Sequence, residues 1–208
     1  MIGIIDYGMG NLRSVEKAFA KLGLPVFISG DPGRLAEAKA LVLPGVGAFG
    51  KAAENLRAGA CIPLIKEWIA AERPFLGICL GLQLLFEKSE EVFDDKTVFP
   101  AGLGIIPGMV KRFPERGLKI PQIGWNNLLI RKRAPYFAET QEGAYVYFVH
   151  SYYVEPADRA WIAAETDYGI RYCSAVSTER MLAVQFHPEK SSRVGLGILK
   201  KFGEMMQA

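Results

Sequence analysis

A cysteine flanked by two glycines stands where a short apolar run gives way to helix-forming residues. Residues 75–78 are apolar enough for a buried strand, and a helix is predicted from Leu80 onward. Cys79 falls at the junction, with Gly77 two residues before it and Gly81 two residues after it. This is the spacing of a nucleophile elbow, a tight strand-to-helix turn that exposes a reactive side chain. Because a helix start favours the thiolate, the pattern predicts a nucleophilic cysteine.

A buried, inert thiol is the alternative interpretation of Cys79, because unpaired cysteine often packs as a small hydrophobe. The two histidines of the chain, His150 and His187, are the imidazoles available as a general base. His187 follows a predicted strand at 181–186, and Glu189 stands two residues further on. In an extended chain the imidazole and the carboxylate then point to the same side. A turn with a surface carboxylate would fit this segment alone, but with the elbow it predicts a Cys-His-Glu triad.

A cysteine that attacks an acyl carbon also needs hydrogen-bond donors for the developing oxyanion. The Gly-rich turn that follows the predicted strand at 41–43 contains Gly45, Val46 and Gly47, whose backbone N–H groups can serve. The N–H of Leu80 on the elbow is a second source of donors. A phosphate-binding loop is the competing interpretation, although the turn lacks the glycine series and the Gly-Lys-Ser/Thr ending of such loops.

The composition is that of an ordinary globular chain. It has 208 residues, of which 50% are hydrophobic and 23% charged, and we expect one domain spanning 1–208. The net charge of +3 is slight and the basic cluster at 131–133 is short, which favours a solvated surface over a nucleic-acid site. Three widely spaced cysteines and two histidines favour neither a disulfide framework nor a metal site. No run reaches the length of a membrane span, and we expect a cytoplasmic protein without a membrane partner.

Apolar runs alternate with helical spacing in the first part of the chain. Strands are predicted at 2–6, 26–28, 41–43 and 75–79, and helices at 11–22, 32–40, 51–56 and 63–71. Further strands are predicted at 145–154, 161–166, 171–176 and 181–186, before a closing helix at 193–206. The pattern predicts an α/β fold: an open, mixed, largely parallel central sheet flanked by helices, with an antiparallel extension in the C-terminal half. Ligands of such sheets bind beyond the carboxyl ends of the strands, where Cys79 and the Gly-rich turn both lie.

Two motifs make the sequence resemble the triad glutamine amidotransferases. They are Gly77-Ile78-Cys79-Leu80-Gly81-Leu82-Gln83 and Gln185-Phe186-His187-Pro188-Glu189. Segments 6–12, 44–49, 124–126 and 147–152 carry a further resemblance to the glutaminase subunits of imidazole glycerol phosphate synthase. The resemblance covers essentially the whole chain.

This resemblance implies that Cys79 attacks the side-chain amide of glutamine, that His187 transfers the protons and that Glu189 orients His187. Gln83, Ser151 and Tyr152 would hold the α-amino and carboxylate groups of the substrate, and no cofactor or metal is implied. His150 is then expected to be structural, because the triad is complete without it.

The resemblance also implies a heterodimer with a cyclase subunit, a (β/α)8 barrel that uses the ammonia to make imidazole glycerol phosphate and aminoimidazole carboxamide ribotide in histidine biosynthesis. Such a barrel takes about 250 residues and does not fit in this chain. The loop at 8–11, Trp125 and Lys190 are candidates to face that partner.

Other functions stay open at this point. A triad glutaminase of pyridoxal phosphate or anthranilate synthesis would carry the same motifs. A protease-like or glyoxalase-like elbow-cysteine hydrolase would give Gln83 and Ser151 no role. A non-catalytic binding subunit is disfavoured, because nucleophile, base and carboxylate are all present.

Overall fold

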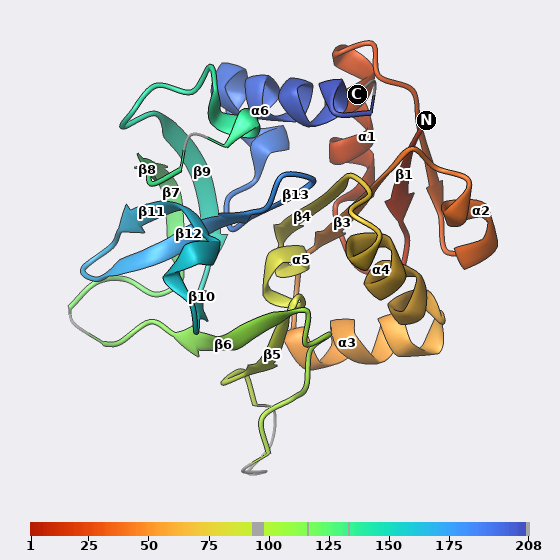
Figure 1. Cartoon of the computed structure of the whole chain (residues 1–208). Coiled ribbons are helices and arrows are strands. Elements are labelled where there is room, and N and C mark those ends of the chain that lie inside the picture. The colour runs from red at the N-terminus through yellow and green to blue at the C-terminus, as the bar shows by residue number, and fades with distance from the viewer. Residues whose placement is uncertain (93–97, 116, 133, 207–208) are drawn as a thin grey trace.

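The centre of the fold is a parallel sheet (Figure 1). The structure is a computed structural model, and it describes residues 1–92, 98–115, 117–132 and 134–206. Its strands, in spatial order, are β2 (Val26–Ser29), β1 (Ile2–Ile5), β3 (Ala40–Gly45), β4 (Phe75–Cys79) and β13 (Met181–Val184). Each neighbouring pair in this series is parallel. β4, which ends at Cys79, therefore lies between β3 and β13, well inside the sheet.

Beyond β13 the sheet continues with mostly antiparallel strands. They are β12 (Arg171–Ser177), β10 (Tyr152–Pro156), β6 (Ile106–Arg112) and β5 (Phe86–Ser89), with β11 (Ile162–Asp167) and β8 (Leu129–Ile130) off this path. β7 (Gln122–Asn127) and β9 (Tyr145–His150) form a separate antiparallel pair. The predicted fold class, a largely parallel sheet with an antiparallel extension, is confirmed.

Helices cover both faces of the parallel sheet (Figure 1). α1 (Leu12–Lys21) and α6 (Ser192–Glu204) pack on one face, and α2 (Pro32–Ala36), α3 (Phe49–Ala58) and α4 (Cys61–Ala70) on the other. Along β3, Leu41 and Leu43 belong to the core beneath α3 and α4, whereas Val42 belongs to the core beneath α1 and α6. This alternation follows from the two-residue period of a strand, and it makes β3 apolar throughout.

The single strand predicted at 145–154 is wrong, because the chain changes sheets at Ser151. β9 pairs with β7, whereas β10 pairs with β6 and β12. The break is held by hydrogen bonds: the N–H of Phe113 donates to the carbonyl of Ser151, and Nδ1 of His150 lies 2.8 Å from the carbonyl oxygen of Tyr152. The change of sheet turns this segment toward the end of β4.

The helix predicted after Cys79 is also shorter than expected. α5 spans only Leu80–Gln83, and the chain enters β5 at Phe86. Residues 80–86 are buried on every side, so the segment has no solvent face along which a longer surface helix could continue. A helix of one turn has only a small dipole, so the favourable field expected at Cys79 is weaker than predicted.

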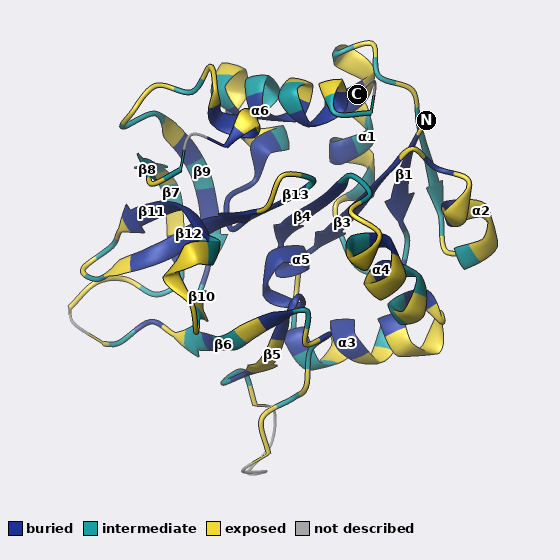
Figure 2. Cartoon of the chain, viewed as in Figure 1, coloured by how far each residue is buried: buried dark blue, intermediate teal, exposed yellow. Residues whose placement is uncertain are grey.

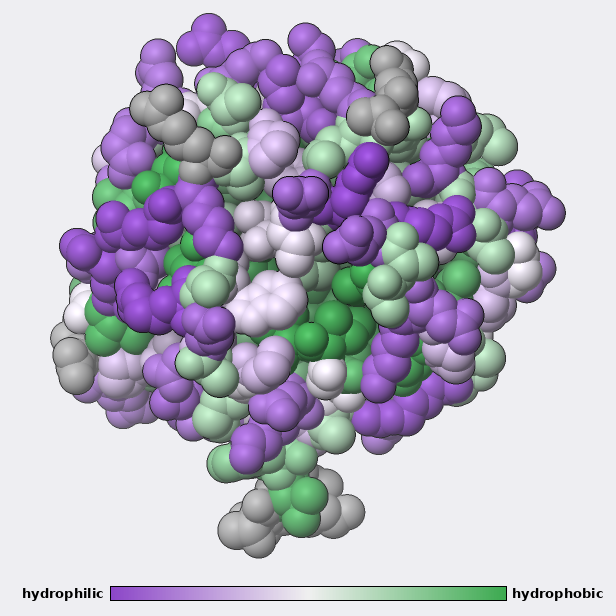
Figure 3. All heavy atoms as spheres, viewed as in Figure 1, coloured by the Kyte–Doolittle hydropathy of each residue, from purple (hydrophilic) through white to green (hydrophobic). Residues whose placement is uncertain are grey.

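Burial follows this layered arrangement. The central strands are buried, and exposed residues collect on the outer sides of the helices and on the loops (Figure 2). On the face seen in Figure 3, hydrophobic side chains gather in the middle, around α5, within a surround of hydrophilic ones. In the described ranges, no helix has the length and apolar character needed to cross a membrane.

Candidate active site

The backbone turns sharply at Cys79. Its φ is 55° and its ψ is −108°, a conformation that residues with a side chain seldom adopt. Glycines make the turn possible: a Cβ added at Gly81 would overlap the carbonyl oxygen of Leu43, and one added at Gly77 would lie 3.0 Å from the Cβ of Ala183. The strand, the strained cysteine and the two tightly packed glycines form the elbow that the sequence predicted.

His187 and Glu189 lie at the end of the neighbouring strand, in the 3-10 turn region that follows β13. The N–H of His187 donates to the carbonyl of Tyr147 on β9 over 2.9 Å. The hydroxyl of Ser191 donates to the carbonyl of His187 over 2.6 Å and accepts from the N–H of Tyr147 over 2.9 Å. These bonds hold the histidine backbone against β9, while its Nδ1 lies 2.9 Å from Oε1 of Glu189.

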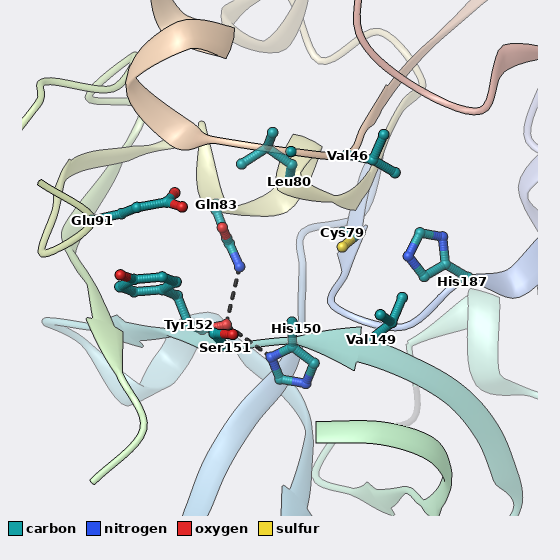
Figure 4. Close-up of a pocket in the computed structure, with 11 residues that line it drawn as sticks. Val46, Cys79, Leu80, Gln83, Glu91, Val149, His150, Ser151, Tyr152 and His187 are labelled. Carbon is teal, nitrogen blue, oxygen red and sulfur yellow. Dashed lines mark hydrogen bonds between the residues drawn. The ribbon is translucent and has the colours of Figure 1, made fainter. Parts of the chain in front are cut away.

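The sulfur of Cys79 and the imidazole of His187 face one another across the end of the sheet (Figure 4). Nε2 of His187 is buried, and no described residue makes a hydrogen bond to it. Burial lowers the pKa of His187, but the interactions with Cys79 and Glu189 raise it more, to about 9. The imidazole therefore readily holds a proton beside the sulfur, where a general base and acid is needed.

A cavity of about 300 Å³ opens in front of these two residues. Its volume is in the range of small-molecule sites. It is lined by Val46, Gly47, Cys79, Leu80, Gln83, Glu91, Val149, His150, Ser151, Tyr152 and His187. The lining thus includes most of the site residues predicted from the sequence. Those residues come from four separate parts of the chain, at 46–47, 79–83, 150–152 and 187.

The Gly-rich turn lies directly beside the elbow. Val46, Gly47 and Leu80 line the cavity, and Gly47 has a φ of +94°, which favours glycine. Gly45 is not among the described lining residues. It pairs in register with Cys79, and a Cβ there would lie 2.5 Å from the hydroxyl oxygen of Tyr7 and 2.8 Å from the Cβ of Leu80. Gly45 is therefore placed to let the turn approach the elbow rather than to line the cavity.

Gln83 also lines the cavity, but its amide nitrogen already donates two hydrogen bonds within the protein. Nε2 donates to the carbonyl of Tyr152 and to Oε1 of Gln185, over 3.0 Å in each case. Ser151 and Tyr152 line the same wall at the point where the chain changes sheets. The amide oxygen of Gln83 is the atom that this residue can offer to a bound molecule.

His150 lines the cavity with its ring fixed by two partners. Nδ1 lies 2.8 Å from the carbonyl oxygen of Tyr152, and Nε2 lies 3.3 Å from the hydroxyl of Tyr172. Burial lowers its pKa to about 4, against the opposing effect of the bond to Tyr152, and the charge of His187 lowers it further. His150 is therefore neutral near pH 7.

Sequence reasoning missed Glu91 and Val149 as lining residues and gave no role to Gln185, whose Nε2 lies 3.6 Å from the sulfur of Cys79. The Glu91 carboxylate accepts a hydrogen bond from the N–H of Phe49 over 2.7 Å. Burial raises the pKa of Glu91, and the bond from Phe49 opposes that rise. No local pattern marks this glutamate, because the contacts that fix it join residues far apart in the sequence.

Other charged groups of the described chain do not form a second centre. The ranges that the structure covers contain no group of three or more His, Cys, Asp or Glu side chains placed to hold a metal ion. In the basic cluster at 131–133, Nε of Arg131 lies 2.6 Å from Glu165, and Lys132 donates to the carbonyl of Ala160. Arg133 lies outside the described residues.

Comparison with known proteins identifies the family. The model of "Glutamine amidotransferase class-I" matches residues 3–205, nearly the whole chain. The chain belongs to the class-I glutamine amidotransferase family. The sequence-based prediction of a glutamine amidotransferase is therefore confirmed, and the elbow and the histidine pair lie in the matched region.

Curated class-I amidotransferases resemble the chain over their full length. Proteins named "Imidazole glycerol phosphate synthase subunit HisH" are 53% identical in Syntrophotalea carbinolica, covering 99% of this chain and 100% of the relative, and 46% identical in Bacillus subtilis, covering 99% and 96%. The one from Geobacter sulfurreducens is 51% identical and covers 98% of each chain. Among the predicted subgroups of the family, that of imidazole glycerol phosphate synthase is confirmed.

Solved structures support the fold. A structure described as "Crystal structure of glutamine amidotransferase" aligns with a TM-score of 0.75 at 17% identity, covering 100% of this chain and 99% of the other. A structure of PurLQS from Thermotoga maritima aligns with a TM-score of 0.73 at 17% identity, covering 99% and 96%. At such identities the likeness concerns the amidotransferase fold alone.

Proposed function

We propose that this chain, as one domain spanning residues 1–208, is the glutaminase subunit of imidazole glycerol phosphate synthase in histidine biosynthesis. It hydrolyses glutamine to glutamate and ammonia with Cys79 as nucleophile, His187 as acid and base, and Glu189 as the group that orients His187. One observation carries the proposal: in a chain of this family, the sulfur on the elbow and His187 meet at one cavity, and His187 is paired with Glu189.

The first half of the reaction forms a thioester. Nε2 of His187 takes up the thiol proton, and the sulfur attacks the side-chain amide carbon of glutamine. The imidazolium then gives its proton to the amide nitrogen, the C–N bond breaks, and ammonia leaves. The raised pKa of His187, about 9, suits this step because the proton is held where the leaving group needs it.

The second half regenerates the enzyme. His187, now neutral, removes a proton from water, and the resulting hydroxide attacks the thioester carbon. The C–S bond breaks, glutamate forms, and the sulfur departs as a thiolate beside the protonated imidazole. In both halves an oxyanion forms, and backbone N–H groups of Val46, Gly47 and Leu80, which line the cavity, are the donors proposed for it.

The cavity wall opposite the triad offers groups for the two ends of glutamine. Glu91 is the lining carboxylate of that wall and suits the α-ammonium group by charge. The amide oxygen of Gln83 is a further acceptor, and Ser151 and Tyr152 border the space for the α-carboxylate. Binding both ends places the side-chain amide at Cys79.

A partner subunit follows from the subunit names of the relatives, and we propose that it is the cyclase, a (β/α)8 barrel. Ammonia released into neutral water is protonated and loses its nucleophilicity, so a cytoplasmic complex must shelter its transfer. The pair β7 and β9 presents a suitable face: Ile123 and Trp125 are 58% and 51% exposed, and they stand opposite Val149 and Tyr147. Because Val149 also lines the cavity, this face is continuous with the site.

The deciding experiment uses the chain together with the purified cyclase subunit and its nucleotide substrate. With glutamine as nitrogen source, the wild type releases glutamate and supports product formation, whereas Cys79→Ala does neither. With an ammonium salt in place of glutamine, the complex containing Cys79→Ala still supports the cyclase reaction. We expect weak activity from the lone chain, since the turn at 45–47 is rich in glycine, which permits several backbone conformations. Retained glutaminase activity in Cys79→Ala contradicts the proposal.

A further inference from the structure

Gln185 contacts the sulfur of Cys79 and does not line the cavity. It follows β13 directly, two residues before His187, and its side chain is fully buried. Its Nε2 lies 3.6 Å from the sulfur, a distance that suits an N–H donor and a sulfur acceptor. A buried amide needs hydrogen-bond partners for its polar atoms, and one partner of the Gln185 amide is the sulfur of Cys79, the reacting atom.

The orientation of this amide is fixed by a chain of hydrogen bonds. The carbonyl of Tyr152 can only accept, so Gln83 must present its Nε2 to it. The same nitrogen donates to Oε1 of Gln185, over 3.0 Å. Since its oxygen is occupied in this way, Gln185 must turn its nitrogen toward Cys79. The ring of His150 meets the same Tyr152 carbonyl from the other side (Figure 4), which further fixes the start of the chain.

We propose that Gln185 is a catalytic residue that donates a hydrogen bond to the sulfur of Cys79, and that Gln83 and Tyr152 are positioning residues that hold it in place. This inference rests on the proposed function, in which Cys79 is the nucleophile. The sulfur is negative before it attacks and again when it leaves the thioester, and it is neutral in between. A donor on its buried side stabilises both charged states while leaving the lone pair that faces the substrate free.

The test replaces the amide with an apolar chain of similar length. Gln185→Met keeps the volume and removes the donor. Tyr136→Phe is the control, because it removes another buried donor, which bonds the carbonyl of Glu179 and does not line the cavity. Alkylation of Cys79 by iodoacetamide is followed by mass spectrometry across pH in the full chain, with Cys79→Ala as background. Thermal unfolding checks that each variant is folded, and Gln185→Leu replaces Gln185→Met if the latter is not.

We expect Gln185→Met to react about tenfold more slowly near neutral pH, because less thiolate is present. At alkaline pH, where all the thiol is ionised, it should react as fast as the wild type or faster, since a thiolate without a donor is more nucleophilic. A packing defect gives no such crossing of the two pH profiles. In complex with the cyclase subunit, kcat for glutamine should fall about 10- to 100-fold with KM within about threefold.

Two results overturn the inference: a Gln185→Met profile that matches the wild type at every pH, or an equal loss of reactivity in Tyr136→Phe. Failure of the proposed function would look different. In that case Cys79→Ala retains glutaminase activity, whatever Gln185→Met does.

Discussion

Nδ1 of His187 lies 2.9 Å from Oε1 of Glu189, and the two side chains are only 3% and 1% exposed. A carboxylate at this distance accepts a hydrogen bond from the Nδ1–H group and so directs Nε2 toward Cys79. The other oxygen of the pair, Oε2 of Glu189, is buried without a hydrogen-bond partner among the described residues. The orientation of the imidazole therefore depends on one buried, charge-assisted bond.

Glu189→Gln tests the charge of that bond. The amide keeps the shape and can still accept from Nδ1, but it no longer stabilises the imidazolium. We expect kcat for glutamine to fall about 10- to 1000-fold with KM changed less than about threefold, since Glu189 does not line the cavity. Steady-state glutamate release by the complex with the cyclase subunit measures both constants. A rise in KM with unchanged kcat would place Glu189 in substrate binding instead.

The raised pKa of His187 predicts a pH dependence of stability. The pKa of about 9 in the folded chain lies above the ordinary value of 6.5, so folding favours the protonated ring. Its stabilising contribution is complete below pH 6.5 and is lost as the pH rises through about 9. We expect the free energy of unfolding of the wild type to decline over this window relative to that of His187→Gln. Urea unfolding of both proteins at several pH values tests this, and parallel curves would contradict it.

The tight elbow predicts opposite effects of one substitution at two glycines. In Gly81→Ala the added Cβ meets the carbonyl of Leu43, so we expect a loss of more than about 2 kcal/mol of stability. Gly197→Ala is the matched control in α6, where nothing lies within 4 Å of the added Cβ. It should stabilise the chain by about 0.5 to 1 kcal/mol, because alanine is the better helix former. Urea unfolding measures both, and a neutral Gly81→Ala would be inconsistent with the packing described.

Local patterns explain how much of the site could be predicted from the sequence. The elbow is encoded within five residues, and the histidine and its carboxylate stand two apart, so composition and spacing were enough to find them. The parallel half of the sheet was equally predictable from the sequence, because its strands are continuous apolar runs such as β3.

Features fixed by tertiary contacts could not be predicted in this way. The break at Ser151 and the early end of α5 depend on which strands the segments meet. Glu91 enters the site because its carboxylate accepts from Phe49, 42 residues away, and Gln185 because its amide meets Cys79, 106 residues away. Neither residue has a local signal that distinguishes it from other polar residues of its kind.

Glu91→Gln tests the substrate end of the cavity. An amide can still accept from the N–H of Phe49, but it lacks the charge for an ammonium group. We expect KM for glutamine to rise about 10- to 100-fold with kcat changed less than about threefold. Glu90→Gln is the control, since Glu90 bonds the N–H of Arg112 outside the cavity. Equal effects of the two substitutions would contradict a specific role for Glu91.

The exposed face of β7 and β9 predicts where the partner binds. Trp125 is 51% exposed, and its ring centroid lies 6.0 Å from that of Tyr147, with the planes at 73°. A large aromatic side chain held in place by a neighbour loses little entropy on binding, which is typical of interface residues with large energetic effects. Because the face adjoins the cavity through Val149, a partner bound here could receive ammonia directly.

We therefore expect Trp125→Ala to weaken the complex with the cyclase subunit about 10- to 100-fold in Kd, as measured by titration calorimetry. Glutamine hydrolysis at saturating partner should be restored, because Trp125 does not line the cavity. Phe99→Ala serves as control: Phe99 is an aromatic side chain that is 42% exposed on another segment, and its loss should leave Kd unchanged. If Trp125→Ala binds the partner as tightly as the wild type, the interface lies elsewhere, and transfer of ammonia past Val149 loses its support.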